Sequence, residues 1–308
     1  MALGTGLASQ FGFVAEGSWN TAGTPNVFLP LVSESMGLDI ERMESKAILA
    51  NRQFMTSEQW APGKRMAGGD IQLELPSVDC GILLHHMMGG SAGSTTRTYT
   101  PANLTGKGLT VQIGVPDVTG TVRPKTYSGC KIASWEIGGA AGEIATWGLS
   151  FIAGNETTAT GLATATYNTG AAIPFTFTGA TILIAGTTTP VSKSTISGDN
   201  KLERRYFEGS SITSEPLQTG LTEITGSIDI EFGNNYTDYN RFVNATESAL
   251  VLNFVSGAKS LAMTMNVRYD GDTPKVGGPG IVPQSLPFKA LATAAGADST
   301  ALTIVHVV

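Results

Sequence analysis

The sequence predicts a mainly β protein with few helices, whose second half repeats the organisation of its first. Glycine and threonine each account for 38 of the 308 residues, and neither residue favours the interior of a helix. Apolar residues make up 41% of the chain and charged residues only 14%. That composition is too apolar for a disordered chain and has fewer charges than an average soluble protein. We therefore expect many strands joined by glycine turns, and a surface partly buried against partners.

The charge balance and the cysteines exclude several classes of protein. The formal net charge is −6, and no dense run of Lys or Arg is present, which disfavours tight binding of phosphate groups. The segment from Met1 to Asn20 has no basic stretch and carries Glu16, so it does not resemble a secretory signal. No apolar run approaches the roughly 18 residues of a membrane helix. Cys80 and Cys130 cannot form a disulfide framework and indicate synthesis in a reducing cytoplasm.

Two alternating segments, half a chain apart, carry the internal repeat. Gly69–Leu75 and Gly226–Phe232 both alternate polar and apolar residues, as does a strand with one buried face. One face of each segment is apolar and is expected in the core: Ile71, Leu73 and Leu75, then Ile228, Ile230 and Phe232. The other face is polar: Asp70, Gln72 and Glu74, then Ser227, Asp229 and Glu231.

The neighbours of these strands repeat in the same order. A charged segment precedes each strand, and the best helix candidate of each half follows it, over Pro76–Met88 and over about Asn235–Ala245. A hairpin then closes each half: Lys131–Ile137 with Trp147–Ile152, and Pro287–Thr293 with Ala301–Val307. Similar composition could produce one such match by chance, but agreement over five segments favours a duplication.

The boundary between the two copies is expected in a segment rich in Thr, Ala and Gly. Asn155 to Gly170 contains Glu156 as its only charge and fits a linker or an extended edge strand. We therefore predict two domains, residues 1–155 with an N-terminal arm and residues 156–308. Two long loops, Gln53–Ala67 and Asp270–Gln284, are candidates for contacts with partners.

The sequence offers no argument for catalysis, a cofactor or a metal. Adjacent His85 and His86 point about 100° apart on a helix and so share a metal poorly, and Cys80 alone does not complete a site. No nucleophile elbow is present. Gly138–Gly142 joins two strands and lacks the lysine of a phosphate loop. We therefore predict that the protein is not an enzyme.

The polar faces of the repeated strands admit two interpretations. Acidic residues commonly occupy a face that is simply solvated. Alternatively, a closed ring of such strands would form a polar-walled channel without exposed edges. Under that hypothesis Asp70, Gln72, Glu74, Asp229 and Glu231 face the bore.

The order of several loose motifs resembles the major tail tube proteins of long-tailed bacteriophages. The similarity runs through these segments: Val14–Thr21, Phe28–Pro30, Ser33–Ser35, Arg42–Leu49, Asn51–Gln53, Gly69–Leu75 and Gly280–Leu291. It thus reaches both ends of the chain. The resemblance implies β-sandwich or barrel-like domains, each with one flanking helix.

The resemblance also implies a function and partners. Members of that family form rings that stack into a tube, through which double-stranded DNA passes during genome ejection. Most carry one tube domain and form sixfold rings, so two domains imply either three chains per pseudo-sixfold ring or hexameric rings. Tape measure, tail terminator and tip proteins are the implied partners, and the implied location is the virion, after synthesis in the host cytoplasm.

Long loops and terminal arms join one ring to the next in that family. The length of Gln53–Ala67 and its Trp60 beside Pro62 favour this loop for the role. We therefore predict inter-ring contacts by Trp60, Pro62 and Lys64, together with the first 35 residues.

Two other classes share this composition. An outer-membrane β-barrel would also be rich in Gly and Thr, but it should show a signal peptide and aromatic girdles. Another viral or surface β-sandwich, such as a decoration domain, would need neither a repeated acidic strand nor polymerisation. The appearance of the purified protein in the electron microscope separates the three.

Overall fold

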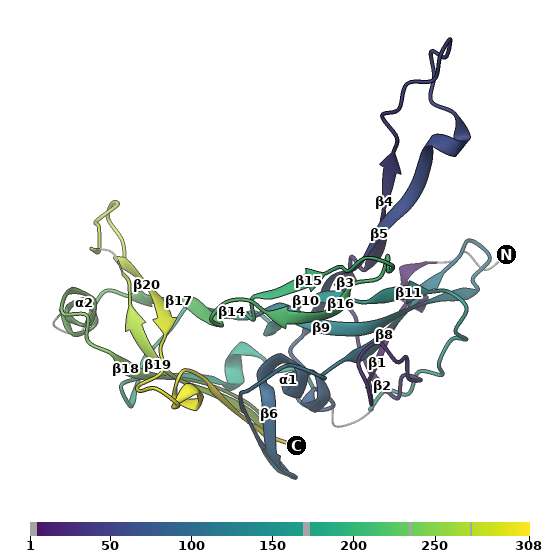
Figure 1. Ribbon diagram of the computed structural model, residues 1–308. Coiled ribbons are helices and arrows are strands. Elements are labelled where there is room, and N and C mark those ends of the chain that lie inside the picture. Colours follow the sequence, from purple (N-terminus) through teal and green to yellow (C-terminus); the bar gives the residue numbers. More distant parts are fainter. Residues whose placement is uncertain (1–4, 169–172, 234–235, 272) are drawn as a thin grey trace.

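The computed structural model describes residues 5–168, 173–233, 236–271 and 273–308, and within them the protein is mainly β (Figure 1). Only two α-helices occur among these residues, α1 (Gly81–Met88) and α2 (Thr237–Val243), and neither is long and apolar enough to cross a membrane. Short 3₁₀ turns complete the helical part: Gly6–Ala8, Ser57–Gln59, Phe177–Gly179 and Asp298–Thr300. The predicted fold class is thereby confirmed.

Eight antiparallel strands form a central sheet that spans both halves of the chain. Their spatial order is β4 (Gly37–Glu44), β5 (Trp60–Glu74), β10 (Thr146–Ala153), β9 (Val122–Ala140), β14 (Lys193–Asp199), β17 (Glu223–Glu231), β20 (Pro283–Ala290) and β19 (Lys259–Tyr269). The short β3 (Ser33–Glu34) also pairs with β5. The first four strands come from the first half of the chain, the last four from the second, and β9 pairs with β14 at the junction.

Each half adds an outer sheet, and the pairing order of the outer strands is the same in both. In the first half the order is β2 (Val27–Leu29), β1 (Gln10–Ala15), β8 (Leu109–Pro116), the start of β9, and β11 (Asn155–Thr157). In the second half it is β12 (Ala180–Ile184), β18 (Ser248–Ser256), the start of β19, and β21 (Thr303–Val307). β13 (Thr187–Thr188) pairs with β12, and the hairpin of β6 (Gly89–Gly93) and β7 (Thr96–Pro101) pairs with β21.

The long strands β9 and β19 belong to both an outer sheet and the central sheet. β9 pairs with β8 up to Cys130 and with β10 from Lys131 onward. Gly129 lies at the crossing with φ +62, and a Cβ there would come within 3.1 Å of the Trp19 ring. Glycine is favoured because it adopts this conformation without steric cost and leaves room for the ring.

The core lies between the sheets and under α1. Ile71, Leu73 and Trp147 of the central sheet are at most 1% exposed, and Leu83 and Leu84 of α1 are fully buried. Asp79 has φ +61 directly before the helix, so the predicted helical stretch from Pro76 is a turn for its first five residues. The predicted second helix matches α2, although its expected start at Asn235 lies outside the described residues.

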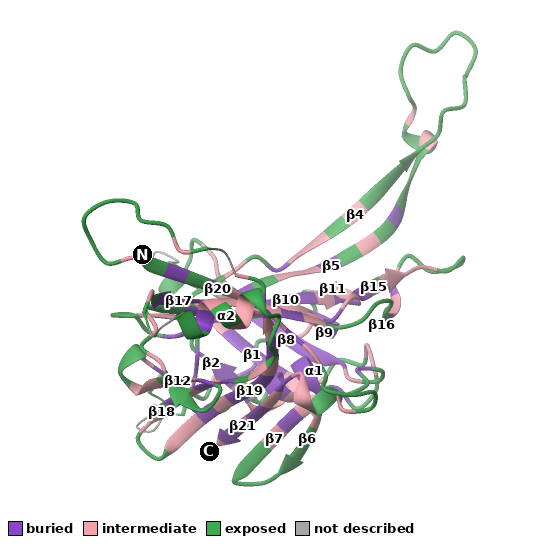
Figure 2. Cartoon of the chain, turned by 90° about the vertical axis from the view of Figure 1, so that its left-hand side faces the viewer, coloured by how far each residue is buried: buried purple, intermediate pink, exposed green. Residues whose placement is uncertain are grey.

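Two hairpins leave the central sheet at corresponding positions. We call residues 38–67 the arm: β4 and the first part of β5 extend it away from the body, with an exposed tip at residues 45–59 (Figures 1 and 2). We call residues 200–222 the docked hairpin, which contains β15 (Leu202–Arg205) and β16 (Ser214–Gln218). It lies over the first half of its own chain and contacts the base of the arm at Arg65 and Ala67, whereas the outer part of the arm extends away from the body (Figure 1).

Two predictions of local structure are wrong. Pro287–Thr293 and Ala301–Val307 do not form a hairpin with each other, because β20 and β21 both pair with β19, at different places along its length. Gln53–Ala67 is not one long loop, because β5 begins at Trp60, which pairs with Glu44 of β4. In the first case the alternation identified both strands but not their partner, and in the second the start of β5 was not recognised as a strand.

Candidate functional surface on the central sheet

The register of the central sheet carries one polar face from β5 across to β17. Gln72, Gly148, Glu136, Ser197 and Thr225 stand opposite one another on five successive strands. Since side chains alternate along each strand, every second residue from this row lies on the same face. The alternation within one strand can be predicted from the sequence. That the two halves share one face is seen only from the pairing of β9 with β14.

All five acidic or amide residues singled out from the sequence lie on this polar face. Asp70, Gln72 and Glu74 are exposed on β5, Glu231 is exposed on β17, and Asp229 is half-buried. The intervening apolar residues are buried in the core: Ile71 0%, Leu73 1%, Ile228 0% and Ile230 5% exposed. The structure therefore brings the two predicted acidic strands into one sheet and onto one side of it.

The carboxylates of the first half stand on this face without basic partners. Among the described residues, no ion pair involves Asp70, Glu74 or Glu136. Glu136 accepts a hydrogen bond from Ser197 Oγ at 3.1 Å. This part of the face therefore carries uncompensated negative charge.

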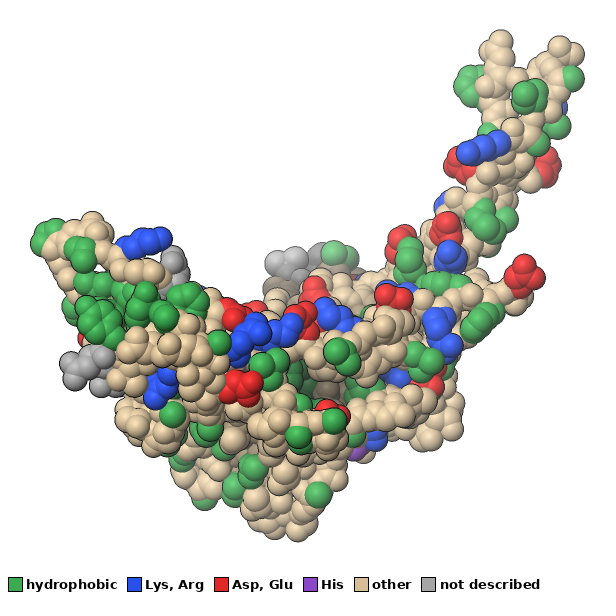
Figure 3. Space-filling model, turned by 60° about the vertical axis from the view of Figure 1, so that its left-hand side comes forward, with side chains coloured by type: hydrophobic (Ala, Val, Ile, Leu, Met, Phe, Trp, Pro, Cys, Tyr) green, Lys and Arg blue, Asp and Glu red, His purple; other side chains and the backbone are tan. Residues whose placement is uncertain are grey.

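The carboxylates of the second half are partly neutralised. Lys201 Nζ lies 2.6 Å from Asp199 and 3.3 Å from Glu223, and Lys289 Nζ lies 2.5 Å from Glu223. Hydrogen bonds from Lys289 and Lys201 hold the pKa of Glu223 below its usual range. The hydrogen bonds that Lys201 donates to Asp199 and Glu223 raise the pKa of Lys201. Basic and acidic side chains accordingly lie side by side in the charged band of Figure 3.

The polar face is hollowed along the junction of the two halves. A shallow depression of about 460 Å³ is lined from both halves, with Asp70, Gln72 and Glu136 on one side and Ser197 and Glu223 on the other. The depression is open to solvent and is lined largely by carboxylates, an amide and hydroxyls. It is therefore unlike a small-molecule site, which is enclosed and mostly apolar. Its chemistry suits water and cations and repels phosphate groups.

The cysteines and histidines form no reactive or metal-binding centre. No group of three His, Cys, Asp or Glu within the described ranges is placed to hold a metal. Burial raises the pKa of Cys80 to about 12, which leaves a thiol and not a nucleophilic thiolate. Its Sγ lies 3.8 Å from both ring nitrogens of His306. No local pattern in the sequence indicates this contact, because the two residues are 226 positions apart.

Trp60, Pro62 and Lys64 lie on the arm and not on the polar face. All three are exposed on the outer part of β5. The Arg42 guanidinium lies 5.7 Å from the centre of the Trp60 ring, and Lys64 Nζ lies 5.4 Å from that of Tyr206 on the docked hairpin. The tip adds further exposed apolar side chains, including Ile48 at 95% and Phe54 at 83%, which is typical of a surface that contacts a partner.

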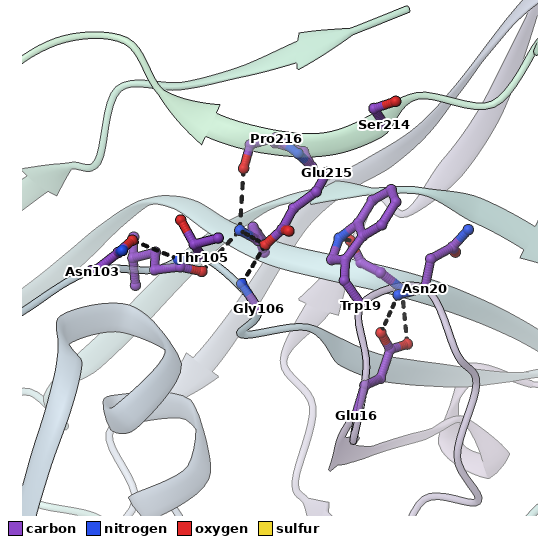
Figure 4. Close-up of polar contacts among 12 residues, drawn as sticks. Glu16, Trp19, Asn20, Asn103, Thr105, Gly106, Ser214, Glu215 and Pro216 are labelled. Atoms are coloured by element: carbon purple, nitrogen blue, oxygen red, sulfur yellow. Dashed lines mark hydrogen bonds and ion pairs between the residues drawn. The ribbon is translucent and has the colours of Figure 1, made fainter.

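A buried polar network fixes the docked hairpin and was not predicted from the sequence (Figure 4). Lys131 on β9 is almost fully buried and its Nζ lies 2.6 Å from the Glu215 carboxylate. The same ammonium donates to Leu104 O at 2.8 Å and Pro216 O at 3.1 Å. A buried lysine paired in this way ties the second half of the chain onto the first.

Glu16 holds a second set of buried contacts near the first hairpin of the chain (Figure 4). Its carboxylate accepts hydrogen bonds from Asn20 N at 2.7 Å, Gly129 N at 2.8 Å and Thr110 Oγ1 at 2.9 Å. These bonds fix the loop of Trp19 against the crossing of β9. The role of this acid is thus structural.

Comparison with models of known protein families identifies a match over most of the chain. The model of a family described as phage tail tube protein matches residues 6–290, nearly the whole chain. No curated protein matches the sequence.

Proposed function

The chain belongs to the phage tail tube protein family and is a structural component of the virion tail; we propose that it polymerises into stacked rings that form the conduit for genome ejection. The observation that carries the proposal is a continuous sheet whose one face is polar and rich in carboxylates while its other face is core. Such a sheet suits the wall of a wet channel.

Each chain contributes two tube domains, residues 1–155 and 156–308. The strand order β4, β5, β10, β9 recurs as β14, β17, β20, β19, and the outer strands recur in the same way. A repeated unit that pairs edge to edge within one chain can continue between chains. Three chains would then make a ring with pseudo-sixfold symmetry.

Ring closure is supported by the two ends of the central sheet. β4 pairs with β5 alone among the described strands, and the last residues of β19, Arg268 and Tyr269, pair with β20 alone. In the repeat, β4 corresponds to β14 and β19 corresponds to β9, and β14 and β9 pair with each other within the chain. Pairing β4 of one chain with β19 of the next removes both open edges, which otherwise invite aggregation.

Inside such a barrel, Asp70, Gln72, Glu74, Asp229 and Glu231 face the bore. Their charge repels the phosphate backbone of double-stranded DNA, so that DNA slides past without binding. Screening limits this repulsion to about 8–10 Å at physiological salt, which is sufficient when the wall lies close to the duplex. The role is that of a conduit and involves no catalysis.

The arm is proposed to join one ring to the next. Trp60, Pro62 and Lys64 on its shaft provide exposed apolar and charged contacts. In the first 35 residues β1 and β2 are part of the outer sheet, and the exposed residues on either side of them, such as Leu7 and Val32, assist. The tape measure protein inside the tube and terminator and tip proteins at its ends are the further partners, in a tail assembled from subunits made in the host cytoplasm.

Electron microscopy of the purified protein tests this function. We expect rings or tubes from the full chain, and soluble subunits or single rings after deletion of residues 57–64. Full-length tubes from the deletion variant would overturn the inter-ring role of the arm. Particles that remain monomeric under every assembly condition would overturn the tube function itself.

A further inference from the structure

The arm and the docked hairpin occupy the same place in the two halves of the chain. Gly37 of β4 pairs with Gly68 of β5, and Ser197 of β14 pairs with Thr225 of β17. Each hairpin leaves the first of these paired strands and returns on the second, over residues 38–67 and 198–224. The two connections therefore correspond in position and differ in length by three residues, so equivalent residues are counted from the nearer of these pairs.

The docked hairpin has a defined seat on the first half. Arg65 N donates to Ser211 O at 2.8 Å, and Tyr206 Oη donates to Arg65 O at 2.8 Å. Arg204 donates to Ala67 O. The hairpin thus covers the stretch of β5 where pairing with β10 has ended, and the Lys131–Glu215 pair completes the seat.

The second half presents the corresponding seat uncovered. Counting from Thr225, Thr222 corresponds to Arg65 and Ile224 to Ala67. A groove of about 550 Å³ lies here, lined by Leu221, Thr222, Ile224, Ala290 and Leu291 among others. Leu221 is 91% exposed. The second half therefore has an exposed apolar side chain at the place where, in the first half, the docked hairpin covers β5.

The basic residue of the seat is also repeated. Lys131 pairs with Ile152, which stands opposite Gly68, and Arg268 pairs with Lys289, which stands opposite Thr225. Arg268 therefore takes the place of Lys131. Its side chain is 42% exposed, and within the part of the chain that the structure describes its ion pair is with the neighbouring Asp270, at 2.9 Å.

The arm tip carries side chains that match this seat. Counted from Gly68 and Thr225, Phe54 and Met55 correspond to Ser211 and Ile212, and Glu58 corresponds to Glu215. Phe54 is 83% and Met55 47% exposed. In the docked position Phe54 and Met55 would contact the groove at Leu221. Glu58 would then lie near Arg268, as Glu215 lies near Lys131 in the first half.

We propose that the arm tip of one chain docks in this groove on the second half of the neighbouring chain in the same ring. The occupant is a second copy, because the arm points away from its own second half (Figure 1) and β4 borders the preceding chain once the ring closes. The inference rests on the proposed ring. The pairing of β4 with β5 shifts register between Ile40 and Arg42, at the position that corresponds to the turn of the docked hairpin at Asn200, and we expect the extended arm to bend there when it docks. The shaft stays available to the adjoining ring.

Cysteine cross-linking tests the seat. Met55→Cys and Leu221→Cys are combined in one chain, assembled, and oxidised; native Cys80 and Cys130 are fully buried. Docking within a three-chain ring predicts disulfide-linked dimers and trimers and nothing larger on a denaturing gel. A ladder beyond trimers indicates contacts between rings and overturns the inference, as does a purely intrachain product. The matched control pairs Met55→Cys with Val118→Cys, an exposed position on the first half, and should remain unlinked.

A charge exchange gives an independent readout with substitutions at exposed positions. Glu58→Arg or Arg268→Glu alone should reduce the yield of tubes at low salt by several-fold, and the double exchange should restore it. Equal yields from all three variants would overturn the docking. If the unmodified chain forms no rings, the proposed function fails; if rings form but neither linking nor charge rescue occurs, only this inference fails.

Discussion

The arm and the docked hairpin start from corresponding positions in the central sheet and end in opposite surroundings. The docked hairpin places Glu215 against buried Lys131 and closes over β5. The arm continues straight from β4 and β5 and exposes Ile48 and Phe54 at its tip. One connection therefore stabilises the subunit, whereas the other is available for contacts between subunits.

A few residues at the base of each hairpin account for the difference. Asn200 is 4% exposed and donates to Met87 O at 3.1 Å and Ile132 O at 3.0 Å, while Lys201 follows with φ +50. The corresponding residues of the arm are Ile40 and Glu41, which have no such partners and continue β4. Local polar contacts thus decide whether the same connection folds back or projects.

The largest expected effect comes from shortening each hairpin in turn. Replacing residues 46–56 of the arm by two glycines should abolish tube assembly and leave the thermal midpoint of the subunit nearly unchanged, because the tip buries little. An equivalent shortening over residues 206–212 of the docked hairpin should lower that midpoint markedly. Equal loss of subunit stability in both variants would remove the distinction between the two hairpins.

Removing the counter-charge of Lys131 should be the next largest effect. Glu215→Ala leaves a buried ammonium without its carboxylate and should cost about 2–4 kcal/mol of unfolding free energy, since Glu215 is itself partly exposed. Glu58→Ala, its counterpart on the free arm, should change the stability of the subunit by less than about 0.5 kcal/mol. Denaturant unfolding of both variants measures the contrast, and a cost for Glu58→Ala equal to that for Glu215→Ala would contradict it.

The hinge of the docked hairpin should contribute less. Asn200→Ala removes the two buried hydrogen bonds that the side chain donates to Met87 O and Ile132 O, which should cost about 1–3 kcal/mol. Hydrogen exchange should show faster opening of β15 and β16 than of β5. Unchanged protection in the hairpin would mean that the turn is held by other contacts.

The ion pairs beside the hinge should have the smallest effect. Since the pKa of Glu223 is held low by Lys289 and Lys201, its stabilising contribution is present above the usual glutamate range near about 4.3 and is lost as the pH falls through the lowered value. Glu223→Gln should flatten the decline in stability over that acidic window. Glu74→Gln, on the unpaired part of the polar face, should leave the decline in place; the same flattening in both variants would argue against the asymmetry between the halves.

The sequence predicted the features that depend on local periodicity. The alternation of Asp70 to Glu74 and of Asp229 to Glu231 identified two strands with one buried face each, and the apolar spacing identified both helices. Ile71 and Ile230 lie in the core as expected. These patterns are short-range, so one segment is enough to show them.

Features that depend on distant partners were not predictable in this way. Lys131 and Glu215 are unremarkable along the chain and meet only because the docked hairpin folds across β9. β20 and β21 alternate like a hairpin pair, yet each joins β19. The sharing of one polar face by the two halves likewise depends on the pairing of β9 with β14, which no single segment encodes.

We propose that two tandem copies in each chain put their shared polar face around a bore closed by three chains. An averaged cross-section of assembled tubes by electron cryomicroscopy tests it most directly. We expect three chains per ring, true threefold and approximate sixfold symmetry, and Asp70 and Asp229 lining the central hole. Six chains per ring, or a density in which these two residues face away from the hole, would contradict it.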